Sequence, residues 1–131
     1  MTGAVVFDTD ILINYAHGKA NWVEDLLQDR RVRVFIPSIV ISEYWAGKEM
    51  DDAKKVLEMD NILSLFEIAD FTKPMAEKLG YWLRHKTYAS GASVVDLMVA
   101  ATTVDLRAKL ATGNRKHFEK ILHGPEFFEF G

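Results

Sequence analysis

The 131-residue sequence contains no cysteine, so disulfide bonds and thiolate metal sites are both excluded. No apolar stretch approaches the roughly 18–20 uninterrupted residues that a membrane-spanning helix needs. The first residues also lack the basic stretch and long apolar run that mark a secretory signal peptide. We therefore expect a protein that makes no use of a membrane and works in a reducing cytoplasm.

An excess of basic residues is also missing, because the net charge is −3. Proteins that bind nucleic acid mainly by neutralising phosphates are usually basic. The charge balance therefore argues against a simple electrostatic nucleic-acid clamp. It is compatible with a nuclease whose acidic residues are neutralised locally by metal ions.

Several common catalytic patterns are absent, including GxSxG, the phosphate-binding P-loop and GxGxxG. The four histidines show no spacing typical of metal ligands. We expect His17 and His123 at the surface, and His117 near the candidate residues described below without a pattern that indicates catalysis.

What the sequence does contain is typical of one globular domain spanning residues 1–131, with 49% hydrophobic and 27% charged residues. Short apolar runs alternate with amphipathic segments. We predict strands at 4–7, 33–36, within 62–68, at 109–112 and, as a last edge strand, at 127–130. We predict helices at 11–16, 20–29, 38–50, 51–59, 73–88, 94–107 and 115–122, with Ser38, Thr72 and Ser93 as caps. This alternation predicts an α/β fold, a three-layer α/β/α arrangement whose mainly parallel sheet of four to five strands has helices on both faces.

Three acidic residues lie at or just after the ends of separate predicted elements. Asp8 follows the first strand, where open parallel sheets form their sites, although it would also cap the next helix. Glu43 interrupts an apolar stretch, and charged side chains are seldom buried unless they are paired or bind metal. A glutamate that faces water or meets a lysine is the simpler interpretation. Asp96 lies in the first helical turn after Ser93, where a capping box explains it equally well.

Together the three acids indicate more than each does alone, since neighbouring carboxylates repel one another unless a cation intervenes. Oxygen ligands suit Mg²⁺ or Mn²⁺ rather than Zn²⁺. Such a site activates water and neutralises charge on a phosphodiester in the transition state. Thr112 and Asn114, after the fourth strand, are further oxygen donors, although Asn114 is also a natural helix cap.

Four segments resemble the conserved motifs of PIN-domain proteins, in particular the VapC-type toxins, in the family's order. They are Phe7–Ile13 (FDTDILI), Ile41–Gly47 (ISEYWAG), Ser93–Thr102 (SVVDLMVAAT) and Ala111–Phe118 (ATGNRKHF). The resemblance covers nearly the whole chain. Its first and third motifs are specific when taken together, whereas the second alone is not.

The resemblance implies that Asp8, Glu43 and Asp96 are catalytic and hold Mg²⁺ or Mn²⁺, with Asp10 as a secondary candidate. It implies that Thr9 and Thr112 orient ligands or water. Asn114 stands where some members carry aspartate, so a second metal ion is less certain than the first. The implied function is RNA cleavage leaving a 5′-phosphate, by the toxin of a type II toxin–antitoxin pair that forms homodimers and is inhibited by a cognate antitoxin protein.

Arg115 and Lys116 follow the fourth predicted strand, and we expect them to contact RNA phosphates unless they only form a solvated helix face. Two other functions fit parts of the pattern. The Asp8–Asp10 segment has the DxD form of phosphatases with an aspartyl nucleophile. A non-catalytic PIN-like module that only binds a partner protein is the second alternative.

Overall fold

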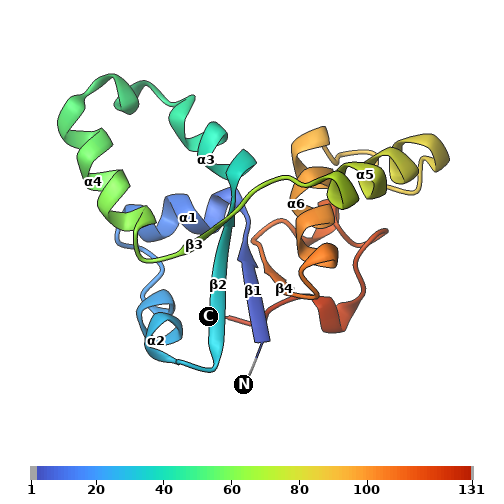
Figure 1. The fold of residues 1–131 in the computed structure, drawn as a ribbon, viewed down its shortest axis with the longest axis horizontal. Coiled ribbons are helices and arrows are strands. Elements are labelled where there is room, and N and C mark those ends of the chain that lie inside the picture. The colour runs from blue at the N-terminus through green and yellow to red at the C-terminus, as the bar shows by residue number, and fades with distance from the viewer. Residues whose placement is uncertain (1–2, 131) are drawn as a thin grey trace.

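A computed structural model describes residues 3–130 of the chain. Its four strands form one sheet in the order β3-β2-β1-β4, and every neighbouring pair is parallel (Figure 1). The strands are β1 (Gly3–Phe7), β2 (Val32–Pro37), β3 (Glu67–Ala69) and β4 (Lys109–Ala111). Because all four run the same way, their carboxyl ends meet at one edge.

Within residues 3–130, six α-helices and three short 3₁₀ turns accompany the strands. The helices are α1 (Thr9–Ala16), α2 (Trp22–Gln28), α3 (Ser38–Trp45), α4 (Ala53–Leu63), α5 (Lys73–His85) and α6 (Val94–Asp105). The 3₁₀ turns are η1 (Lys48–Asp51), η2 (Arg115–His117) and η3 (Gly124–Glu126).

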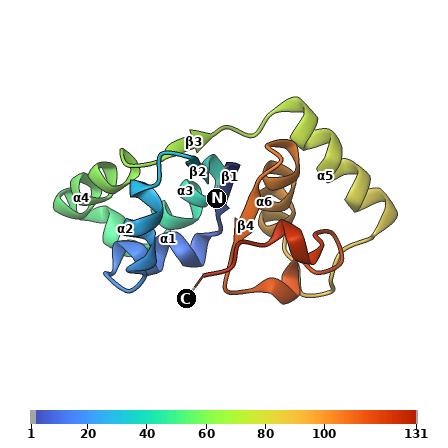
Figure 2. The same cartoon turned by 90° about the horizontal axis from the view of Figure 1, so that it is seen from below.

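The helices lie in two layers, one on each side of the sheet (Figure 2). Helices α1 to α4 lie on one side, where α1 packs on β1 and both α2 and α3 pack on β2. Helix α6 packs on β1 and β4 from the other side, and α5 packs on α6. The predicted three-layer α/β/α fold with a parallel sheet is therefore confirmed.

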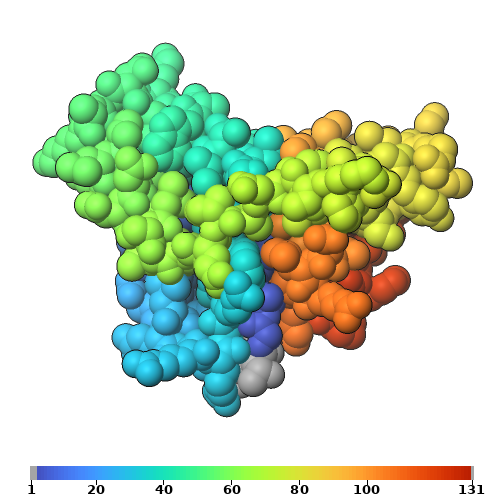
Figure 3. Space-filling view, in the orientation of Figure 1, coloured from blue at the N-terminus to red at the C-terminus, as the bar shows by residue number. Residues whose placement is uncertain are grey.

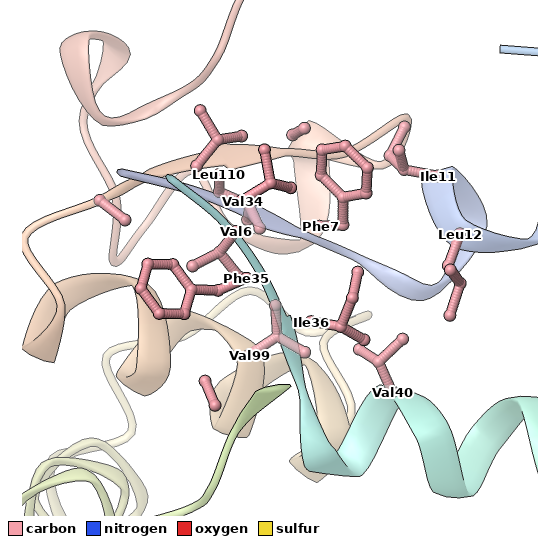
Figure 4. Packing of buried hydrophobic residues seen from close by; sticks show 14 of the residues in the cluster. Val6, Phe7, Ile11, Leu12, Val34, Phe35, Ile36, Val40, Val99 and Leu110 are labelled. Carbon is pink, nitrogen blue, oxygen red and sulfur yellow. The ribbon is translucent and has the colours of Figure 1, made fainter. Parts of the chain in front are cut away.

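Strand β1 is covered on both faces, and Val5, Val6 and Phe7 are fully buried. Successive residues of a strand point to opposite faces, so both helix layers draw on the same apolar run. Phe7 contacts the rings of Trp22 and Phe66. Figure 4 shows Phe7 and neighbouring core side chains around the sheet. This central position fixes where β1 ends, and hence where Asp8 lies.

Several predicted elements differ from the structure, most clearly those at 38–50, 115–122 and 127–130. The helix predicted at 38–50 ends at Trp45, because Gly47 has an extended backbone. Ser38 is its first helical residue rather than its cap, since β2 runs through Pro37 directly into the helix. The helix predicted at 115–122 forms only the turn η2.

The edge strand predicted at 127–130 is reduced to one parallel bridge between Leu110 and Phe127. The Phe128 amide donates to the Leu110 carbonyl over 2.8 Å, and no second bridge follows among the described residues. The turn η3 immediately precedes this segment and leaves little length for pairing. The segment 127–130, called the C-terminal segment below, instead crosses the β4 edge and reaches α2, where Phe128 and Phe130 stack on Trp22.

The carboxyl edge of the sheet lies between α3 and the first turn of α6 (Figure 1). At this end the outline of the molecule dips between a lobe of α3 and α4 and a lobe of α5 and α6 (Figure 3). Register aligns Phe7 with Ala111, so the next residues, Asp8 and Thr112, lie side by side. Among residues 3–130, no helix has both the length and the apolar character needed to cross a membrane.

Candidate metal centre at the carboxyl edge of the sheet

Asp8 is buried at the end of β1, with 5% of its surface exposed. One carboxylate oxygen accepts from the Thr9 amide over 2.8 Å and caps α1, and the other accepts from the Thr112 hydroxyl over 2.7 Å. The pKa of Asp8 is raised to about 6, mainly by burial and to a smaller extent by the negative charges of Asp10 and Asp96, against the lowering effect of the two hydrogen bonds. The capping interpretation is thus correct, but it does not account for the burial of this carboxylate beside two others.

Asp10 points toward the loop after β4. Its Oδ2 accepts from the Gly113 amide over 2.8 Å, whereas its Oδ1 is buried without a hydrogen-bond partner. A Cβ atom on residue 113 would collide with Asp10 Oδ2, so a larger residue there would have to displace the Asp10 carboxylate. Burial, assisted by the charge of Asp96, raises the pKa of Asp10. An unpartnered carboxylate oxygen at this place leaves a donor or a cation to be supplied from outside the chain.

Asp96 lies in the first turn of α6, and its position is fixed by the predicted capping box. Its amide donates to Ser93 Oγ over 3.1 Å, and its Oδ2 accepts from the Ser93 amide over 2.9 Å. The same oxygen lies 3.1 Å from His117 Nδ1. The side chain is 16% exposed, so it is held at the edge of the site rather than in open solvent.

Glu43 extends from α3 and is exposed, as the simpler interpretation of its sequence position predicts. Its Oε1 accepts from the Thr9 hydroxyl over 2.8 Å. Because the Thr9 amide also donates to Asp8, Thr9 joins Glu43 to the buried carboxylate. Glu43 therefore lies at the periphery of the site, linked to Asp8 through one residue.

The loop after β4 closes the other side of the site. The buried Thr112 hydroxyl donates to Asp8 and accepts from the Asn114 amide over 3.0 Å. Asn114 precedes η2, but its side chain makes no capping bond, so the predicted capping role is wrong. Because the Thr112 hydroxyl both donates and accepts a hydrogen bond, its orientation is fixed, and it can in turn orient the Asp8 carboxylate.

The PIN domain family profile matches residues 5–122, which cover the sheet except for the first two residues of β1 and include all of the carboxylates described above. The chain belongs to the PIN-domain family. The family predicted from the four sequence motifs is thereby confirmed. A search of the curated proteins finds no match.

Solved structures share the fold of this PIN domain along nearly its whole length. A chain of VapBC2 from Rickettsia felis, bound to a promoter DNA fragment, has 25% identity and a TM-score of 0.73, with 95% of each chain covered. A toxin–antitoxin complex from Klebsiella pneumoniae has 23% identity and a TM-score of 0.71, with 95% of this chain and 96% of that chain covered. FitAcB from Neisseria gonorrhoeae has 24% identity and a TM-score of 0.66, with 88% and 91% covered.

The chemistry of the donors at this PIN-domain site fits a divalent cation. Within residues 3–130 no three acidic or histidine side chains already stand in the arrangement of an ion site. However, burial raises the pKa values of Asp8 and Asp10, the negative charge of Asp96 adds to both shifts, and Asp10 Oδ1 lacks any partner. All donors are oxygens, which suits Mg²⁺ or Mn²⁺ rather than Zn²⁺.

The loop that carries Arg115 and Lys116 borders a groove of about 550 Å³. Arg115 lies over the ring of Phe127 and donates to Glu129 over 2.8 Å. Lys116 is exposed. Both predicted substrate-binding residues thus line one groove, which begins at Thr112 beside the carboxylates.

Sequence reasoning underrated His117 and overlooked Gly113. The ring of His117 lies against Asp96 and close to Gly91, where a Cβ atom would approach it to 3.6 Å. No spacing rule reveals this contact, because it joins a loop to a helix 21 residues away. The useful signal was the place of both residues just after β4, at the edge where sites form.

Proposed function

We propose that this PIN domain is a metal-dependent endoribonuclease and the toxin of a type II toxin–antitoxin pair. The observation that carries the proposal is the meeting of Asp8, Asp10 and Asp96 at the carboxyl edge, where burial raises the pKa values of Asp8 and Asp10 and one oxygen of Asp10 has no partner. A structural cluster would use fewer buried acids or pair them with cations. Membership of the PIN-domain family and likeness to toxin–antitoxin complexes support the same conclusion.

In this proposal Asp8 and Asp96 are the principal ligands of Mg²⁺ or Mn²⁺, Glu43 is the third acid, and Asp10 is an auxiliary one. When bound, the cation would activate a water molecule and neutralise charge on the phosphodiester. Thr112 and Thr9 keep the two oxygens of Asp8 in fixed directions. Holding a ligand in place in advance lowers the cost of reaching the productive geometry.

The proposed substrate is RNA, whose phosphates would contact Arg115 and Lys116 at the mouth of the groove. Arg115 is suited to this role because an RNA phosphate can take the place of Glu129, an exposed partner. Charge-assisted contacts of this kind position the strand without selecting its sequence.

An antitoxin is the proposed protein partner, since the related structures include toxin–antitoxin complexes. Three adjoining hollows on the side of α1 to α4 suit a partner segment with apolar and basic side chains. The glutamates in their walls are Glu24, Glu43, Glu49 and Glu58. The proposal also includes a homodimer, which light scattering of the purified protein tests, since a particle of 14.9 kDa would contradict it.

The decisive experiment incubates the purified protein with total RNA and Mg²⁺, with and without a chelator, and maps the new 5′ ends. We expect cuts that depend on the cation and carry a 5′-phosphate. Intact RNA under all conditions would contradict the nuclease and leave the alternative of a non-catalytic binding module. The family profile that matches the chain is that of the PIN domain, which leaves the phosphatase alternative without support.

A further inference from the structure

We propose that the groove between the loop 112–117 and the C-terminal segment, called the tail groove below, holds a nucleotide of a single-stranded RNA next to the carboxylates. The proposal rests on the proposed function, since it takes RNA as the substrate. It adds a binding subsite with two walls of different chemistry, one aromatic and one cationic.

The tail groove opens directly from the candidate metal centre. Its lining begins with Thr112 and Gly113, whose hydroxyl and amide hold Asp8 and Asp10. An RNA strand that has one phosphate at the carboxylates therefore places a neighbouring nucleotide in the groove. The volume of about 550 Å³ falls within the range of about 300–1,000 Å³ that is usual for small-molecule sites, which is room for a nucleotide.

Aromatic rings of the C-terminal segment form one wall. The Phe130 ring stacks on Trp22 with centroids 4.6 Å apart and planes inclined by 21°, and Phe128 stacks on the same indole at 5.8 Å. Phe130 nevertheless keeps 39% of its surface exposed. An aromatic side chain held by a partner yet open to solvent is a platform for an unpaired base, because every base has a face that stacks.

Basic and polar side chains form the opposite wall, with Arg115 held over Phe127 and Lys116 exposed. Among residues 3–130, no hydrogen bond engages the side-chain amide of Asn114, which leaves its donor and acceptor for a base edge. Two acids also line the groove, Glu119 and Glu129. The carboxylate of Glu129 is already engaged by Arg115, so the local charge is less negative than a count of acids indicates.

The charged residues favour the tail groove, rather than the three hollows on the α1 to α4 side of the carboxylates, as the place where RNA binds. Those hollows contain four glutamates, two lysines and His17 in their walls, whereas the tail groove contains two glutamates, an arginine, a lysine and His117. A polyanion leaving the site is therefore repelled on the α1 to α4 side and guided toward β4.

The test measures binding of a 5′-labelled single-stranded RNA octamer by fluorescence anisotropy, in an Asp8→Asn background that keeps the RNA intact. Phe130→Leu retains apolar packing on Trp22 but removes the stacking platform. Its matched control is Tyr81→Leu, an exposed aromatic of α5. We expect Phe130→Leu to raise Kd about fivefold or more and the control to leave it unchanged.

The cationic wall is tested by Lys116→Gln against Lys109→Gln, an exposed lysine at the opposite end of β4. Only the first should reduce the slope of log K against log salt, by about 0.7 for a single strand. Both positions are exposed, so this pair remains informative if Phe130→Leu weakens the fold.

Failure of the subsite and failure of the nuclease give different results. Unchanged binding by Phe130→Leu and Lys116→Gln, while the wild-type chain cleaves RNA, overturns the tail groove and leaves the nuclease standing. Weakened binding by both variants, with no cleavage by the wild type under any cation, supports the groove and overturns the nuclease. Absence of any binding to the octamer overturns the groove.

Discussion

Two aspartates of this PIN domain play the same local role in different surroundings. Asp8 caps α1 through the Thr9 amide, and Asp52 caps α4 through the Lys54 amide at 2.9 Å. Asp52 is exposed, whereas Asp8 is buried against a second hydrogen-bond donor and two further acids. The cap explains why an aspartate is tolerated at both positions, but only the surroundings of Asp8 turn a cap into a candidate metal ligand.

The capping boxes of α5 and α6 differ in the same way. Thr72 pairs with Met75, which is 2% exposed and belongs to the core. Ser93 pairs with Asp96, whose carboxylate reaches the edge of the sheet beside His117. One helix start thus serves packing, and the other presents a charge to the site.

Removing the charge from each aspartate cap gives the largest expected contrast. Asp8→Asn keeps an oxygen that accepts from the Thr9 amide but loses the ligand charge. Because a catalytic metal contributes several kcal/mol, we expect RNA cleavage to fall by about 10³-fold, while Asp52→Asn cleaves like the wild type. Initial rates on one labelled RNA measure the difference. Equal rates in the two variants would remove Asp8 from the catalytic site.

Metal-free stability should depend on pH through Asp8. Its pKa is raised from 3.8 to about 6 in the folded chain, so the folded state binds the proton more tightly. The resulting stabilisation is complete below pH 4 and is lost as the pH rises through about 6, with a total near 3 kcal/mol. Urea unfolding in chelator at several pH values tests this expectation. The pH dependence of stability should be smaller in Asp8→Asn. At pH 7, adding Mn²⁺ should stabilise the wild-type protein again.

Removing the hydroxyl that orients Asp8 should have a smaller effect. Thr112→Val keeps the size of the side chain but loses the donor, so we expect cleavage and Mn²⁺ affinity to fall about 10- to 100-fold. Thr103→Val is the matched control, since Thr103 is equally buried but donates to Val99 within α6. Calorimetric titration with Mn²⁺ separates loss of metal binding from loss of fold. An affinity as high as that of the control would contradict an orienting role for Thr112.

Sequence reasoning succeeded where local signals decide the structure. The apolar run that ends at Phe7 predicted the central strand and the position of Asp8, and the caps at Thr72 and Ser93 predicted the starts of α5 and α6. These features depend on neighbours within a few residues, where hydrophobic periodicity and capping chemistry are strong signals.

The remaining features depend on contacts between distant parts of the chain. The Gly113 amide reaches Asp10 across 103 residues, and Thr9 reaches Glu43 across 34. The path of the C-terminal segment is set by stacking on Trp22 rather than by pairing with β4, so its strand-like pattern was misleading. No local pattern predicts such contacts, because tertiary packing overrides propensity there.

The smallest expected effect completes the comparison of the two caps. Asp52→Ala removes the acceptor for the Lys54 amide at an exposed helix start, which should lower the free energy of unfolding by about 1 kcal/mol. Cleavage per folded molecule should not change, because no described contact joins Asp52 to the carboxyl edge. Urea unfolding and cleavage rates on the same preparation measure both quantities. If Asp52→Ala reduced cleavage without unfolding, the surroundings of Asp8 would no longer distinguish it from Asp52, and the role given to Asp8 would need a different basis.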